Sequence, residues 1–260
     1  PGPAGRAMAI AMVGTPLARS VGIPAGTFLG GFFGWRPTFG SLSVIALLLV
    51  GWVIAKVPDF DGETAIERPS LVDVFAVPGI RPVLGVTLCF VLAHNILYTY
   101  IAPLLATHGI FGETDRILLA FGVAGLVSIG LTGALIDKWL RPLTFISVGL
   151  FLASALILTW TATAPFAVYG AALVWGLGFG GAATLFQTAS ARAAGPAADV
   201  AQAMIVTVWN IAIAGGAILG GVILVTAGAA GLPLAGITLL LIAAGSSLRV
   251  ARTRSEAIPT

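Results

Sequence analysis

The sequence contains few residues of the kinds that form crosslinks or bind metals. It has one cysteine, Cys89, and two histidines among 260 residues. A single cysteine cannot form an internal disulfide, and these few side chains offer no Cys/His spacing for zinc. We therefore expect neither a structural metal nor redox chemistry, and no cofactor.

Charged residues are also scarce. Only 9% of the residues are charged, 58% are hydrophobic, and the mean hydropathy is +1.05. Ordinary soluble domains carry about 25% charged residues, so this composition indicates a protein whose partner is the lipid bilayer. The formal charge of +3 comes from basic residues at the ends of apolar runs, not from a basic patch, which argues against nucleic-acid binding.

Long apolar runs recur along the whole chain. A helix needs about 20 mostly apolar residues to cross the hydrocarbon core of a bilayer. The sequence predicts an all-α membrane protein with eight transmembrane helices, approximately at residues 7–33, 39–55, 82–105, 117–136, 143–161, 166–189, 200–227 and 232–248.

The polar segments between these runs predict an orientation and a division into domains. If the first helix runs outward, the outer loops hold only Arg36 and Arg116, and nearly all other basic residues are cytoplasmic. The positive-inside rule then places both chain ends in the cytoplasm. Residues 56–81 carry five acids and predict a cytoplasmic linker between two helices at 1–55 and a six-helix bundle at 82–260.

Small residues form a stripe along the first predicted helix. Glycine or alanine recurs every four residues there, which lets another helix approach closely, and Pro24 favours a bend. Shifting this helix by 190 residues aligns four identical residues within six positions, which suggests an internal repeat. The residues of the stripe are Gly14, Ala18, Gly22, Gly26 and Gly30, and the repeat places Gly26, Leu29, Gly30 and Gly31 on Gly216, Leu219, Gly220 and Gly221.

The run from Gly22 to Gly31, followed by Gly34-Trp35-Arg36, resembles the antiporter signature on the fifth helix of drug and sugar efflux proteins of the major facilitator superfamily. In the fuller signature, glycine immediately precedes proline. Here Ile23 does, which resembles the arabinose-efflux and chloramphenicol-efflux branch. The resemblance assigns signature positions to Gly14, Gly22, Pro24, Gly26 and Gly30.

A second motif lies between the fourth and fifth predicted helices. Gly133 to Lys138 and then Arg141 look like the second-half copy of the superfamily's cytoplasmic-loop motif. That resemblance implies that Asp137 belongs to a cytoplasmic gate, where the acid pairs with a basic residue or a helix end. The glycine that usually follows the basic residue is absent, and this weakens the expected gate.

The resemblance also implies an architecture and a function. It makes the first predicted helix the family's fifth, so that about four amino-terminal helices of a two-bundle fold are lacking. The implied activity is proton-coupled efflux of a small amphipathic drug or sugar by alternating access, by a monomer in the bacterial inner membrane. Uptake or facilitative transport, or a fragment that transports nothing, remain alternatives.

An intramembrane enzyme is the rival class of function. The sequence contains no Gly-x-Ser-x-Gly or His-Glu-x-x-His motif and no paired acids within the apolar runs. It also has no glycine loop of the kind that binds phosphate in ATP-driven proteins. These absences favour a transporter over an enzyme.

Polar residues within the apolar runs are candidates for the transport pathway. Arg19 lies in the middle of the first predicted helix, where a guanidinium costs about 2.5–3.5 kcal/mol on insertion scales. It could anchor substrate, replace a proton site electrostatically, or form a structural pair. The sequence does not decide between these roles.

His94, Asn95 and Tyr98 lie three or four residues apart, and we expect them to share one helix face towards the central cavity. An imidazole, with a reference pKa of about 6.5, could carry the coupling proton. An interhelical hydrogen bond is an equally good interpretation. Asn210 and Gln187 are further candidates, for which packing roles are at least as well supported.

Overall fold

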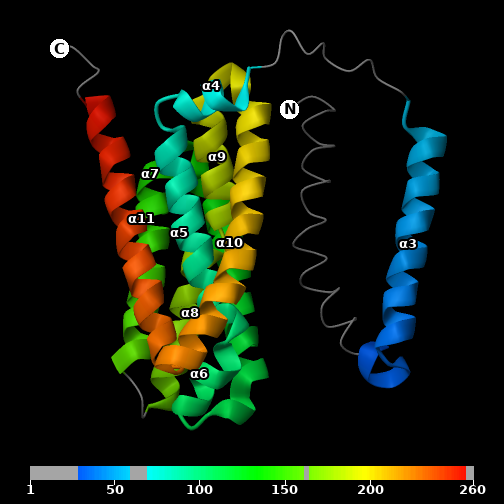
Figure 1. Ribbon diagram of the computed structural model, residues 1–260, viewed down its shortest axis with the longest axis vertical. Helices are drawn as coiled ribbons and strands as arrows, with labels where there is room; N and C mark the ends of the chain where they lie inside the picture. Colours follow the sequence, from blue (N-terminus) through cyan, green and yellow to red (C-terminus); the bar gives the residue numbers. More distant parts are fainter. Residues whose placement is uncertain (1–28, 59–68, 161–163, 256–260) are drawn as a thin grey trace. The chain divides into compact units, whose positions relative to one another are not determined.

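The computed structural model describes residues 29–58, 69–160 and 164–255. The chain divides into two compact units, residues 1–67 and 68–260. The described residues form helices and turns and contain no β-strand (Figure 1). The observed elements agree with the all-α fold class that the apolar runs predict.

The first unit contributes one long apolar helix, α3 (Trp35–Lys56). It follows Gly34, whose φ of 80° lies in the left-handed region that favours glycine. None of its residues is buried, and its 22 residues span about 33 Å. A helix that is apolar on all sides and this long fits a membrane. The predicted span at 39–55 lies within it.

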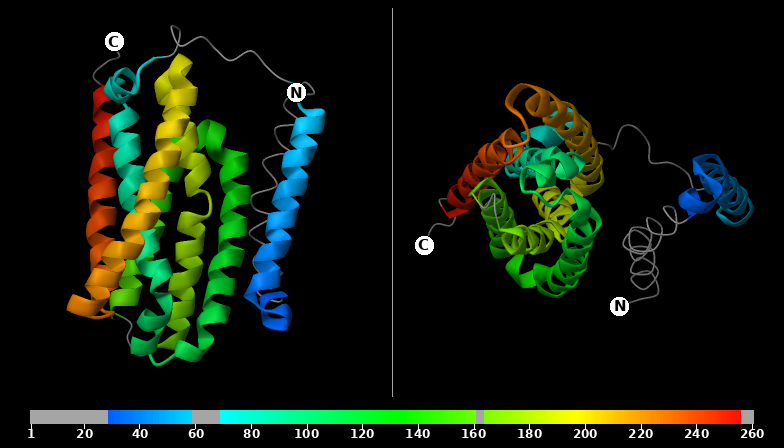
Figure 2. Two further views of the ribbon diagram at one scale, coloured as in Figure 1. Left: turned by 45° about the vertical axis from the view of Figure 1, so that its right-hand side comes forward. Right: turned by 90° about the horizontal axis from the view of Figure 1, so that it is seen from below.

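The second unit is a helical bundle. Within its described residues, α5 packs between α10 and α11, and α8 packs on α7 (Figure 2). The helices are α4 (Leu71–Ala76), α5 (Ile80–Thr99), α6 (Ile101–Thr107), α7 (Thr114–Trp160), α8 (Pro165–Phe179), α9 (Ala182–Ala194), α10 (Ala198–Ala227) and α11 (Gly231–Ser255), with short 3₁₀ turns η2 (Phe111–Glu113) and η3 (Gly195–Ala197).

Helix α7 is a hairpin of two arms. Its 47 residues would extend about 70 Å as one straight helix, more than twice the hydrocarbon thickness. Trp139 has non-helical angles, φ −122° and ψ 24°, and Ile117 and Leu158, from opposite ends of the helix, line the same pocket. The chain therefore reverses direction near Trp139, between the two predicted spans at 117–136 and 143–161.

A second reversal joins α9 to α10 through η3. The Gln202 side chain of α10 donates to the Gln187 carbonyl of α9 at 3.0 Å, and the Ser190 hydroxyl donates to the Ala201 carbonyl at 3.4 Å. These contacts bring the start of α10 back along the end of α9, which agrees with separate spans at 166–189 and 200–227.

Two predicted spans are interrupted in the structure. The span at 82–105 breaks at Tyr100, between α5 and α6, and the span at 166–189 breaks at Gly180 and Gly181, between α8 and α9. Helix α5 also begins at Ile80, two residues inside the predicted linker. The span at 7–33 lies mostly outside the described residues, so the total of eight helices stays a prediction.

Serine hydroxyls from α7 hold the break between α8 and α9. The Ser128 hydroxyl donates to the Leu177 carbonyl at 2.6 Å and accepts from the Gly181 amide at 3.2 Å. Leu177 and Gly181 are four residues apart, so the hydroxyl stands where a helical hydrogen bond would otherwise form. From the other arm of α7, Ser147 donates to the Gly178 carbonyl. Serine side chains thus provide hydrogen-bond partners for the backbone groups at the break.

We expect Ser128→Ala to destabilise the bundle by about 1–3 kcal/mol, because the half-buried Leu177 carbonyl and the buried Gly181 amide would both lose their partner. Thermal unfolding of the purified protein in detergent measures this. Ser246→Ala is the matched control, since the Ser246 hydroxyl donates to the Ile242 carbonyl of its own helix in an exposed position. Equal midpoints for the two variants would contradict the bridging role.

Candidate functional site

His94 lies at the centre of a cluster of aromatic rings. Its side chain is buried, with 7% exposed, and its ring is stacked on Phe179 of α8, with centroids 3.5 Å apart and planes 11° apart. Tyr98, one turn along α5, stacks on it at 5.1 Å. Phe121 of α7 and Trp175 of α8 approach at 5.8 and 5.3 Å. The structure therefore brings His94 and Tyr98 together, within an aromatic cluster from three helices.

The cluster gives the imidazole ring aromatic packing partners on several sides. A neutral ring packs as an aromatic side chain, and such pairs contribute about 0.5–1.5 kcal/mol beyond their buried area. The packing of His94 is thus explained without a change in its charge.

The cluster reaches the surface of the bundle at Tyr98. Its side chain is 38% exposed, whereas Trp175 is 2% exposed. On the other side, Phe179 contacts Trp209 of α10 at 6.1 Å. The rings therefore link α5, α8 and α10, and Tyr98 is an exposed ring of the cluster in direct contact with His94.

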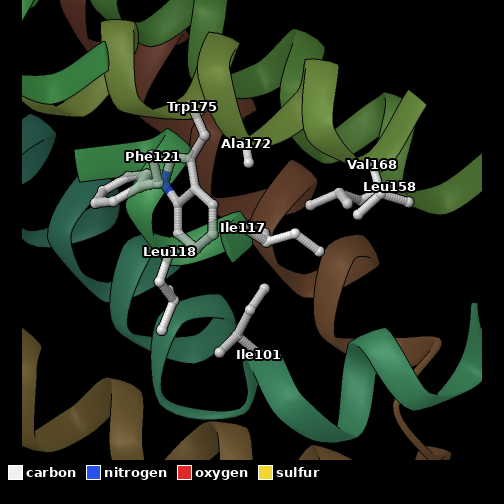
Figure 3. Close-up of a pocket in the computed structure, with 8 residues that line it drawn as sticks. All are labelled: Ile101, Ile117, Leu118, Phe121, Leu158, Val168, Ala172 and Trp175. Carbon is white, nitrogen blue, oxygen red and sulfur yellow. The ribbon is translucent and has the colours of Figure 1, made fainter. Parts of the chain in front are cut away.

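Next to the cluster lies a small apolar pocket. Its walls come from α6, α7 and α8, and Trp175 and Phe121 belong to both the pocket and the cluster (Figure 3). The pocket volume is about 10 Å³, the room of one water molecule, so in this conformation no sugar or nucleoside fits. The Trp175 indole N–H, at its wall, has no hydrogen-bond acceptor among the described residues. The remaining lining residues are Ile101, Ile117, Leu118, Leu158, Val168 and Ala172.

The other predicted pathway residues lie apart from His94. Asn95 donates to the Val91 carbonyl of its own helix at 2.9 Å and packs against Gly216 of α10, so it turns away from the cluster. Gln187 is half-buried at the α9–α10 contact. Asn210 is exposed and donates to the Val206 carbonyl at 2.8 Å. Of the three residues His94, Asn95 and Tyr98, the structure therefore brings only His94 and Tyr98 into contact, and their role in transport stays a prediction.

Asp137 of the predicted gate motif forms an ion pair. Arg192 of α9 binds Asp137 of α7, with Nη2 and Oδ1 3.1 Å apart, and Nη1 donates to the Asp137 carbonyl at 3.4 Å. Lys138 and Arg141 are exposed, and neither has an ion-pair partner among the described residues. Gly133 faces open space, with no neighbour that a Cβ would meet within 4 Å. The loop acid thus ties the α7 reversal to α9 within one bundle.

We expect this ion pair to contribute little to stability, about 0.2–1 kcal/mol, because the Asp137 side chain is 93% exposed and that of Arg192 is 45% exposed. The measurement is a double-mutant cycle of Asp137→Asn and Arg192→Gln on thermal unfolding, at low and high salt. A coupling energy well above this range, insensitive to salt, would contradict a solvent-screened pair.

Most of the proposed antiporter signature lies outside the described residues, as does Arg19. Gly14, Gly22, Pro24 and Gly26 therefore have no structural account, whereas a Cβ added to Gly30 would lie 3.9 Å from the Thr38 hydroxyl oxygen. In the second half of the suggested repeat, Gly216 packs on Asn95 and Gly220 on the Tyr100 ring. These glycines permit the close approach of α10 to α5.

No group of three or more His, Cys, Asp or Glu side chains that could hold a metal occurs in the described ranges. Four described helical segments are long and apolar enough to cross a membrane, and two of them reverse within their length. An apolar bundle of this kind, with buried aromatic rings and small residues between helices, defines an integral membrane protein.

The sequence comparisons identify the family. The profile of the Major Facilitator Superfamily matches residues 3–217, and the chain therefore belongs to this superfamily of transporters. It is 28% identical over 237 residues to a probable sugar efflux transporter of Pasteurella multocida, covering 89% of this chain and 58% of the relative. A purine ribonucleoside efflux pump of Shigella dysenteriae is 28% identical over 220 residues, covering 83% of this chain and 55% of the relative.

These comparisons bear out the suspected resemblance to efflux proteins of this superfamily, which is a family of transporters and not of enzymes. The chain spans a little over half the length of these curated relatives. The superfamily match also agrees with the membrane location that the composition predicts.

Proposed function

We propose that the protein takes part in proton-coupled efflux of a small molecule across the bacterial inner membrane, as a monomer with both chain ends in the cytoplasm. The similarity to two kinds of efflux transporter supports the direction of transport. The observation that carries the proton coupling is the burial of His94 within an aromatic cluster that reaches the surface at Tyr98. Imidazole is the side chain best suited to exchange a proton near neutral pH.

The substrate that we propose carries a sugar ring, either as a free sugar or as part of a nucleoside. These are the compounds named for the relatives, and both present a flat or weakly apolar face to an aromatic side chain. Tyr98 offers such a surface, since its ring is 38% exposed. The Trp175 N–H could donate to a substrate hydroxyl if the adjacent pocket enlarged. Amphipathic drugs are the second substrate class.

Alternating access gives the Asp137–Arg192 pair its proposed role. In a fold of two bundles, substrate binds between them near the midplane. An exposed pair at the α7 reversal is weak, so its formation and loss cost little during the cycle. We propose that it stabilises the closed state of the predicted cytoplasmic side.

The test measures efflux from cells that express the protein. Cells are loaded with a labelled sugar, a labelled purine ribonucleoside or chloramphenicol, and retention is followed with and without a protonophore. We expect lower retention of one sugar-containing compound, restored by the protonophore. Unchanged retention across the panel would contradict efflux, and efflux unaffected by the protonophore would contradict proton coupling.

A second candidate is that these 260 residues transport nothing by themselves. Two observations favour it: the chain spans a little over half the length of its relatives, and α3 exposes apolar side chains on all sides. Proteoliposomes that contain only this chain distinguish the two candidates. Protonophore-sensitive uptake of substrate into them would exclude the second.

A further inference from the structure

Arg81, at the start of α5, is held in a fixed position by α4. Its Nε donates to the Phe75 carbonyl at 3.1 Å, and its guanidinium carbon lies 5.0 Å from the centroid of the Phe75 ring. These contacts use one of five N–H donors and one face of the guanidinium. Arg81 is exposed, and no acceptor among the described residues binds its Nη groups. The fork that usually binds carboxylates or phosphates therefore points to the surface of the protein.

The corner that presents Arg81 is anchored in the bundle. Val74 and Ile80, on either side of it, are 1% and 0% exposed. Gly79 makes the turn between the helices with φ 100°, a conformation that favours glycine. Ser70 caps α4 by accepting from the Asp73 amide at 3.1 Å. The position of the guanidinium is thus set by the fold and not by a flexible loop.

The same short helix exposes apolar side chains. Leu71, Val72 and Phe75 are 62%, 76% and 43% exposed, although they lie next to the buried Val74. Figure 1 shows α4 lying across one end of the bundle. A basic residue beside exposed apolar side chains, at the end of a membrane bundle, matches the boundary between lipid headgroups and acyl chains.

The charge at this end favours the cytoplasmic leaflet. The end is identified by Gly79, which lies beside Ala193 of α9, and by the nearby Asp137–Arg192 pair. The described basic residues at this end are Arg81, Lys138, Arg141 and Arg192, and the described acidic residues are Asp73, Asp137 and Asp199. At the opposite end, Tyr169 donates to Glu113 and His108 contacts the Leu158 carbonyl. That end has one described basic residue, Arg116, and two acidic residues, Glu113 and Asp115. The positive-inside rule assigns the first end to the cytoplasm, where the leaflet is anionic.

We propose that the α4–α5 corner binds one anionic phospholipid of the cytoplasmic leaflet. The Nη groups of Arg81 bind the phosphodiester, and Leu71, Val72 and Phe75 contact the first carbons of the acyl chains. The site lies outside the aromatic cluster and the ion pair, so it is independent of which substrate the protein transports. It fixes the depth of α5, the helix that carries His94, relative to the membrane surface.

Native mass spectrometry of the whole chain, released from nanodiscs of equal parts phosphatidylglycerol and phosphatidylcholine, tests the proposal. We expect Arg81→Gln to lower retained phosphatidylglycerol roughly fivefold, the effect of one basic residue at a membrane surface, and to leave phosphatidylcholine unchanged. Arg116→Gln, which removes an exposed arginine from the opposite end, is the matched control. Equal retention by both variants, or equal loss of the two lipids, would overturn the proposal.

A second measurement does not depend on the Arg81 variant. In a Cys89→Ser background the chain has no other cysteine, so a fluorophore can be attached through Val72→Cys. We expect a blue-shifted emission that lipid-borne quenchers near the headgroup reduce and that water-soluble quenchers hardly reduce. Full access to a water-soluble quencher would place α4 in water and refute the lipid contact.

Discussion

Gly180→Ala is expected to be among the most destabilising methyl additions to the bundle. A Cβ on Gly180 would lie 2.7 Å from the Gly125 Cα, whereas optimal carbon contacts are about 3.5–4.0 Å. Gly180 has ordinary right-handed angles, so backbone strain does not oppose alanine and only the clash remains. Because the neighbour is backbone, we expect a loss of about 1–3 kcal/mol or more, seen as a lower thermal midpoint and less folded protein.

Two other glycines in α7 and α8 provide matched controls. A Cβ on Gly125 would meet its nearest atom, the Gly176 carbonyl oxygen, at 3.8 Å, and one on Gly170 in α8 would meet nothing within 4 Å. Gly125→Ala and Gly170→Ala should therefore be neutral or slightly stabilising, since alanine favours a helix by about 0.5–1 kcal/mol over glycine. Similar losses for all three variants would show that the close approach of α7 and α8 is not what the glycines provide.

Much of the fold could be predicted because hydrophobic thickness limits helix length. The apolar runs located α3, α10 and both arms of α7 to within a few residues, since each must bury about 20 residues in lipid. The breaks at Tyr100 and Gly180 could not be predicted in this way. They depend on tertiary contacts, such as the Ser128 hydroxyl between Leu177 and Gly181, that have no local signal in an apolar run.

The candidate site was predicted only in part. The spacing of His94 and Tyr98 placed them together correctly, but their main partner, Phe179, lies 85 residues further along the chain from His94 and was missed. Trp175 and Phe179 are one turn apart, as are His94 and Tyr98, and this matching spacing is the signal that could have suggested two facing aromatic edges. The loop motif drew attention to Asp137, whose role in a gate stays a prediction, whereas its ion-pair partner Arg192 was not predicted, because several basic residues end the predicted spans.

His94→Phe should separate the two interpretations of His94 that the sequence left open. Phenylalanine preserves a flat ring against Phe179 and Tyr98, so the aromatic packing and the thermal midpoint should change little. It removes the only imidazole in the described part of the cluster. If His94 carries the coupling proton, protonophore-sensitive efflux should fall at least about tenfold, which corresponds to about 1.4 kcal/mol, while exchange of labelled for unlabelled substrate continues.

The other histidine makes the comparison specific. His108 follows the last residue of α6 and contacts the Leu104 and Leu158 carbonyls at 2.9 and 3.2 Å, away from the aromatic rings. His108→Phe should therefore leave proton-driven efflux intact. His94→Ala should lose both stability and transport, because it empties the centre of the cluster and costs stacking with several rings. If His94→Phe transports as well as the unchanged protein, the histidine serves packing alone, and the coupling proton must bind elsewhere on the chain.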